Sequence, residues 1–127
     1  MVKIIKLNFD GDLDEVNINI KNDKFNLSLI KESLKIEDDN FKEHYEWDVG
    51  DMCILKLLGN NSSKEEENIH QLPIDGEYQF FGDLYLVMLS KNNLKELDIE
   101  NFEYIYNALY CGQDIDDIDT KRMKIFT

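Results

Sequence analysis

The chain has 127 residues, of which 27 are acidic and 14 are basic, so its formal net charge is −13. This length suffices for one domain with its own hydrophobic core. Phosphate recognition depends on clustered Lys and Arg, and here these residues cluster only at Lys121, Arg122 and Lys124. We therefore expect no direct binding of nucleic acid. The negative charge instead favours a basic protein partner.

Residues 2–21 predict a β-hairpin. Their apolar residues recur at every second position on both sides of Asp10-Gly11-Asp12, which has the composition of a tight turn. Asn26 is a suitable N-cap for a short helix, because the apolar residues of 27–34 recur three and four positions apart. A hairpin followed by a helix also allows a β-grasp-like start, by analogy of fold alone.

A second hairpin and a buried strand are predicted in the middle of the chain. Polar and aromatic residues alternate in 42–47 and an apolar run follows in 52–58, with turn residues between them. Residues 59–69 are rich in Asn, Ser and Glu, a composition that cannot bury itself, so we expect a mobile acidic loop. The unbroken apolar stretch within residues 80–89 predicts a central strand buried on both faces.

The last predicted element is a helix that begins near Asp98 and stops at Gly112. Together the elements predict a single small α+β domain over residues 1–112, with a mostly antiparallel sheet and about two helices packed on one face. Residues 113–127, first acidic and then basic, predict a C-terminal tail.

The N-terminus and the cysteines indicate a protein of a reducing compartment. Basic residues interrupt the apolar residues 1–6, so no signal peptide is expected, and the longest apolar runs are far shorter than the ~18 residues that a spanning helix needs. Cys53 and Cys111 lack a disulfide or Cys-x-x-Cys spacing. We therefore expect a cytoplasmic protein that is neither secreted nor inserted in a membrane.

One acidic motif near the N-terminus is similar to a metal-binding loop. Asp10, Asp12 and Asp14 alternate as at the opening of a calcium loop. Glu15 stands where that loop requires Gly, however, and Lys21 stands where it requires a bidentate Glu. A hairpin turn is therefore the favoured interpretation.

Groups able to catalyse a reaction do not converge in the sequence. The aspartates within residues 114–119 could hold Mg²⁺, but neither a Gly-rich phosphate loop nor a basic clamp accompanies them. His44, Cys53, His70 and Cys111 show neither paired ligand spacing nor an electropositive setting for a thiolate. We expect no catalytic residue, no metal site and no cofactor, and keep a small metal-dependent enzyme built on the C-terminal aspartates as an alternative.

Aromatic residues give the more suggestive signal. They dominate the strongly binding positions of protein interfaces, because they bury large areas at a low entropy cost. Most must still belong to the core, and Trp47 and Tyr78 are expected to be the most exposed because each lies beside a turn. The candidate partner-binding residues are Trp47, Pro73, Tyr78, Phe80 and Phe81.

Several short phrases follow one another between residues 42 and 119. They are Tyr45-Glu46-Trp47, Glu67-Asn68-Ile69-His70-Gln71-Leu72-Pro73-Ile74-Asp75, Phe80-Phe81-Gly82-Asp83, Tyr104-Ile105-Tyr106 and Cys111-Gly112-Gln113-Asp114-Ile115. In order and spacing they resemble an uncharacterised protein family of nucleocytoplasmic large DNA viruses, the mimivirus and chlorovirus relatives, of which this chain would be a divergent member. The resemblance implies a setting in a virion or in a viral factory of the host cytoplasm, and no activity.

The expected function is that of a non-enzymatic interaction or structural protein, a giant-virus virion or viral-factory component that docks on a protein partner through residues 73–81. One alternative is an acidic decoy or adaptor that regulates a basic nucleic-acid-binding protein, and the other is the metal-dependent enzyme. The partner, the oligomeric state and the stage of any viral cycle are left open.

Overall fold

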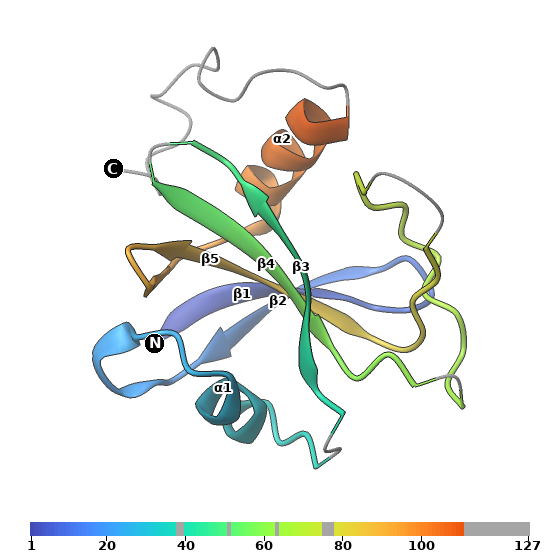
Figure 1. Ribbon diagram of the computed structural model, residues 1–127, viewed down its shortest axis with the longest axis horizontal. Helices are drawn as coiled ribbons and strands as arrows, with labels where there is room; N and C mark the ends of the chain where they lie inside the picture. The colour runs from blue at the N-terminus through green and yellow to red at the C-terminus, as the bar shows by residue number, and fades with distance from the viewer. Residues whose placement is uncertain (38–39, 51, 63, 75–77, 111–127) are drawn as a thin grey trace.

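The computed structural model describes residues 1–37, 40–50, 52–62, 64–74 and 78–110 (Figure 1). The secondary-structure elements, in chain order, are β1 (Val2–Leu7), β2 (Leu13–Ile18), the short 3-10 helix η1 (Lys21–Asp23), α1 (Leu27–Ser33), β3 (Lys42–Asp48), β4 (Cys53–Gly59), β5 (Leu84–Ser90), β6 (Asn93–Lys95) and α2 (Ile99–Tyr110).

The strands form one antiparallel sheet in the order β2-β1-β5-β4-β3, with β6 also paired to β5. β1 pairs with the first part of β5 and β6 with its last part, so these two strands share one side of β5 while β4 occupies the other. The predicted single α+β domain with a mostly antiparallel sheet is confirmed.

β5 lies at the centre of the sheet and is buried on both faces, as its apolar run predicts. Leu84, Leu86 and Met88 point into the core on one side of the sheet. The alternate residues Tyr85 and Val87 point into the core on the other side. Because successive side chains of a strand face opposite ways, an unbroken apolar run needs a cover on each face.

The two helices provide these covers from opposite sides of the sheet (Figure 1). Phe102 and Ile105 of α2 pack with the cluster that holds Leu86, whereas Ile30 of α1 packs with the cluster that holds Val87. The prediction that both helices pack on one face is therefore wrong. Two separate apolar faces, each requiring burial, are the physical reason.

Both predicted helix caps are present. The Asn26 side chain accepts a hydrogen bond from the Leu29 N–H at 3.1 Å, and Asp98 accepts one from the Asn101 N–H at 2.8 Å. Each bond satisfies a backbone donor that has no partner inside the helix. The first and second predicted hairpins are also confirmed, as β1–β2 and β3–β4.

The predicted strand over residues 80–89 begins only at Leu84. Gly82 has a φ of +76°, a left-handed conformation that ends extended backbone before the strand starts. β6 was not predicted, because three residues give too short a periodic signal. The predicted tail at 113–127 lies outside the described residues.

Candidate functional site

A buried asparagine anchors the long connection between β4 and β5. Asn68 is 7% exposed, and its Nδ2 donates to the backbone oxygens of Leu7 at 3.0 Å and Gly82 at 2.9 Å. Its Oδ1 accepts from the His70 N–H at 3.0 Å. A buried amide is costly unless it is hydrogen-bonded, so these bonds fix Asn68 at the start of residues 68–74 and 78–80, which we call the covering loop.

Residues 59–69 were expected to form an acidic loop that buries none of its side chains. Asn68 is an exception, because it is buried and anchored. Glu65 and Glu66 are exposed, as their charge requires. Glu67, also exposed, forms an isolated bridge with Phe81, and the Ile69 N–H donates to the backbone oxygen of Phe9 at 3.0 Å. The end of this segment is therefore joined to the sheet, while its mobility stays a prediction.

The covering loop packs on the α2 side of the sheet. Leu72 is buried in the same core cluster as Phe102 of α2. The Tyr106 hydroxyl of α2 donates to the backbone oxygen of Gln71. The loop and α2 thus cover this face of the sheet together.

Trp47 is only 7% exposed, so the prediction that it lies at the surface is wrong. Its side chain faces the α2-side core, and its Nε1–H donates to the backbone oxygen of Pro73 at 2.9 Å. Trp47, Pro73 and Leu109 line an apolar cavity of about 10 Å³. Trp47 therefore supports the covering loop from within the core, and little of its side chain is exposed.

Tyr78 is 37% exposed, in agreement with the prediction. Its hydroxyl donates to the backbone oxygen of Leu72 at 2.9 Å and accepts from the Leu72 N–H at 2.6 Å, which ties Tyr78 to the backbone at Leu72. The Phe80 ring lies 5.4 Å from the Tyr78 ring, and both Phe80 and Pro73 are half-buried. Phe81 is half-buried at the entry to β5, where its N–H donates to Asn61.

Two residues that the sequence reasoning did not select complete this surface. Tyr45, on β3, is 38% exposed and its ring centre lies 4.9 Å from that of Trp47. The half-buried His44 meets the Phe80 ring edge-on at 5.6 Å. In the sequence, the alternation of aromatic and polar residues in β3 pointed to these two residues. The sequence alone could not show that β3 lies close to Pro73 and Phe80. The aromatic face is defined as His44, Tyr45, Pro73, Tyr78 and Phe80.

His44 is held by the backbone of β4. Its Nε2–H donates to the backbone oxygen of Gly59 at 2.8 Å. Burial lowers the pKa of His44 below its ordinary value of 6.5; the bond to Gly59 raises the pKa and the charge of Lys42 lowers it. The imidazole is accordingly neutral near pH 7.

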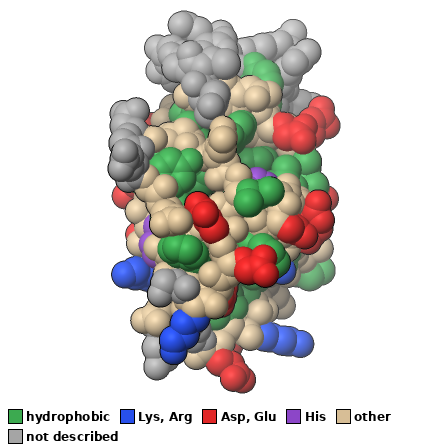
Figure 2. Space-filling model, turned by 90° about the vertical axis from the view of Figure 1, so that its right-hand side faces the viewer, with side chains coloured by type: hydrophobic (Ala, Val, Ile, Leu, Met, Phe, Trp, Pro, Cys, Tyr) green, Lys and Arg blue, Asp and Glu red, His purple; other side chains and the backbone are tan. Residues whose placement is uncertain are grey.

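Figure 2 shows the side of the molecule on which the β4–β5 connection lies, with apolar side chains interspersed among acidic ones. On β3, next to the aromatic face, Glu43, Glu46 and Asp48 are all exposed. Only Glu43 among these three forms an ion pair within the described residues, with Lys56 Nζ at 3.1 Å. Glu46 and Asp48 alternate with Tyr45 and Trp47 along β3, so their carboxylates lie on the α1 side of this strand and the aromatic face lies on the α2 side.

Across the described ranges, no group of three or more His, Cys, Asp and Glu side chains could hold a metal ion. Asp10 and Asp14 serve the β1–β2 turn instead, where Asp10 accepts from the Asp12 N–H and Asp14 accepts from the Asn8 side chain. His70 hydrogen-bonds the Asp12 backbone oxygen through its ring. The favoured hairpin turn is confirmed, whereas Cys111 and the aspartates within 114–119 lie outside the described residues.

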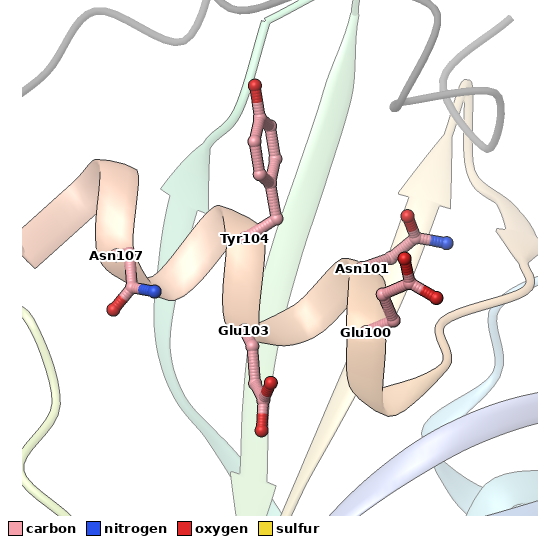
Figure 3. Close-up of a pocket in the computed structure, with 5 residues that line it drawn as sticks. All are labelled: Glu100, Asn101, Glu103, Tyr104 and Asn107. Atoms are coloured by element: carbon pink, nitrogen blue, oxygen red, sulfur yellow. The ribbon is translucent and has the colours of Figure 1, made fainter.

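A hollow of about 440 Å³ lies along the outer face of α2 (Figure 3). It is lined by Glu100, Asn101, Glu103, Tyr104 and Asn107. Glu100 and Asn101 appear together at one end of the helix, whereas Tyr104 points away from Glu103 and Asn107 (Figure 3).

Comparison with known proteins finds no match to a family model, to a curated protein or to a solved structure. In the part of the chain that the structure describes, no helix combines the length and the apolar character needed to cross a membrane.

Proposed function

We propose that this protein is a non-enzymatic interaction module that binds a protein partner through the aromatic face. The observation that carries the proposal is that two exposed tyrosines from distant segments each contact one buried support: the Tyr45 ring lies 4.9 Å from that of Trp47, and the Tyr78 hydroxyl bonds to the backbone of Leu72. That support consists of Trp47, hydrogen-bonded to the loop, and of Leu72 beneath it.

The physical argument is preorganisation. Association costs free energy when side chains and loops must be ordered, and a loop that is already ordered avoids that cost. The bonds of Asn68, Trp47 and Tyr78 to the backbone hold the covering loop before any partner arrives. Tyrosine supplies a large, stiff contact with a polar tip, which suits a surface exposed to water in the free protein.

The setting that we propose is a virion or viral factory in the host cytoplasm. It is supported by the resemblance of residues 42–119 to the viral family. The partner would then be another component of the same assembly, and the exposed carboxylates along β3 favour a basic one.

The acidic decoy is the second candidate, favoured by the net charge of −13. Salt dependence separates the two candidates. A decoy that fills a nucleic-acid groove replaces many phosphates, so its affinity should fall by about a thousandfold or more when salt rises from about 50 mM to about 200 mM. Docking through the aromatic face involves few charge pairs and should weaken by less than about tenfold.

The proposal is tested by comparing Tyr45→Ser with Leu29→Ser in the full chain. Both side chains are exposed to a similar degree, 38% and 40%, but Leu29 lies on α1 on the opposite side of the sheet. Quantitative recovery of partners from the native source should drop by about tenfold or more for Tyr45→Ser and stay unchanged for Leu29→Ser. Equal recovery by both variants, with unaltered melting temperatures, would refute the aromatic face as the docking site.

A further inference from the structure

The outer edge of β3 has backbone groups that point away from the sheet. β3 ends the strand order, and in the described ranges no backbone group of another segment hydrogen-bonds to this edge. The Val49 N–H donates to the Cys53 oxygen of β4 at 3.1 Å. Because antiparallel ladders alternate, the backbone groups of Trp47 face β4 as those of Val49 do, and those of Glu46 and Asp48 face outward.

The two sides of this edge differ in chemistry. On the α2 side the edge carries Tyr45 and, next to it in the chain, His44, whose ring contacts Phe80. The Phe80 ring in turn contacts that of Tyr78. On the α1 side it carries the exposed carboxylates of Glu46 and Asp48, because side chains alternate along a strand.

The carboxylate side of the edge is not neutralised by its neighbours. Lys56 is the cross-strand neighbour of Glu46, but its Nζ contacts Glu43 at 3.1 Å and lies 4.8 Å from the centre of the Phe25 ring. Within the described part of the chain neither Glu46 nor Asp48 has an ion-pair partner.

We propose that the β3 edge binds, by strand addition, an extended segment of another protein in which basic and apolar residues alternate. Its backbone bonds to the outward groups of Glu46 and Asp48. Its basic side chains, on one face, meet the carboxylates of these residues, and its apolar side chains, on the other, meet Tyr45 and Tyr78. This inference rests on the proposed function and names the chemistry of the partner.

A second copy of the chain fits this edge poorly. Two β3 strands paired edge to edge in antiparallel fashion keep the same faces on the same side, so the carboxylates of Glu46 and Asp48 from both copies would gather together. Like charges placed opposite one another destabilise strand pairing. Each copy also carries a net charge of −13, which opposes association further.

The probe is a short capped peptide of alternating Lys and Val, titrated into the ¹⁵N-labelled full chain. The expected result is chemical-shift change concentrated on β3, including the Glu46 and Asp48 amides. The same peptide with N-methyl groups on alternate residues keeps its charge but loses its donors, and should bind at least about tenfold more weakly. Equal binding of the methylated peptide, or shifts spread over the whole acidic surface, would overturn strand addition.

Charge reversal at one site supplies a matched control. Glu46→Lys and Glu103→Lys change the net charge equally, but Glu103 is exposed on the outer face of α2. Glu46→Lys should weaken peptide binding by about tenfold and Glu103→Lys by much less. Equal weakening would assign the binding to the overall charge and overturn the proposal.

The chain's own C-terminus is the rival occupant, because Arg122 and Lys124, outside the described residues, alternate with Met123 and Ile125 in the sequence. Peptide affinity should be unchanged when Arg122 and Lys124 are both replaced by Ser in the full chain. Affinity that tightens by about tenfold would assign the edge to the C-terminus and overturn the proposal. If the peptide fails to bind while Tyr45→Ser still loses its partner, strand addition is wrong and the aromatic face stands.

Discussion

At the scale of single residues, several polar side chains fix the backbone of distant segments by hydrogen bonds. Asn68 is the clearest case, because one side chain joins β1, the covering loop and the turn before β5. Its importance is invisible in the sequence, since Leu7 is 61 residues away along the chain. A polar residue in an acidic stretch gives no local sign that distant carbonyl groups will surround it.

Asn68→Ala should destabilise the protein by about 2–4 kcal/mol, because it leaves the Leu7 and Gly82 carbonyl oxygens without their donor. Urea unfolding followed by Trp47 fluorescence measures the change. Asn107→Ala is the control, since that side chain is exposed on α2 and should alter stability by less than about 0.5 kcal/mol. Similar small effects for both variants would show that Asn68 does not anchor the covering loop.

His44 should make stability depend on pH. Burial lowers the pKa of the native imidazole below 6.5, so the unfolded chain takes up a proton first as the pH falls. The contribution of His44 to the free energy of unfolding is fully present above pH 6.5. It is lost progressively as the pH falls from 6.5 to the lowered native pKa. Urea midpoints measured from about pH 7.5 to about pH 5 should fall less for His44→Gln than for the unaltered protein. An identical pH profile for the two would contradict the structural role of this imidazole.

At the scale of elements, the sequence predicted those features that depend on residues close together in the chain. The hairpins and the caps at Asn26 and Asp98 follow from periods and side chains that act within a few residues. The placement of the two helices on opposite faces depends on how the connections cross the sheet, which no local pattern records. Trp47 was misjudged for the same reason, because its cover comes from Pro73, 26 residues further along the chain.

Trp47→Phe should loosen the covering loop while leaving the sheet intact. The change keeps an aromatic ring in the core but removes the donor to the Pro73 carbonyl, at a cost of about 0.5–1.5 kcal/mol. Hydrogen exchange should accelerate at residues 70–74 and stay unchanged in β5. Uniform acceleration across both would instead indicate loss of global stability without a specific role for the loop contact.

At the scale of the whole molecule, charge and topology have separate roles. The net charge of −13 opposes compaction by self-repulsion, and the sheet with a helix on each side supplies the burial that offsets it. The charge could be read from composition, whereas the location of the aromatic face needed the fold, because it joins β3 to a loop that begins 20 residues later.

Salt should stabilise the folded protein. Screening weakens the repulsion among the exposed acidic side chains, whereas ion pairs such as Lys3–Glu15 at 3.6 Å are partly exposed and contribute little. The melting temperature should therefore rise by a few degrees between about 10 mM and about 300 mM sodium chloride. A melting temperature that falls with salt would show that favourable ion pairs outweigh repulsion in this fold.

Site-specific photo-cross-linking in the native setting tests the docking surface most directly. A photoreactive phenylalanine analogue at Tyr45, on the aromatic face, is compared with the same analogue at Leu29, on α1. We predict that position 45 yields one dominant cross-linked protein, abolished when Tyr78 is also changed to Ser, and that position 29 yields none. A partner that cross-links at position 29 and not at position 45 would contradict the assignment of the aromatic face.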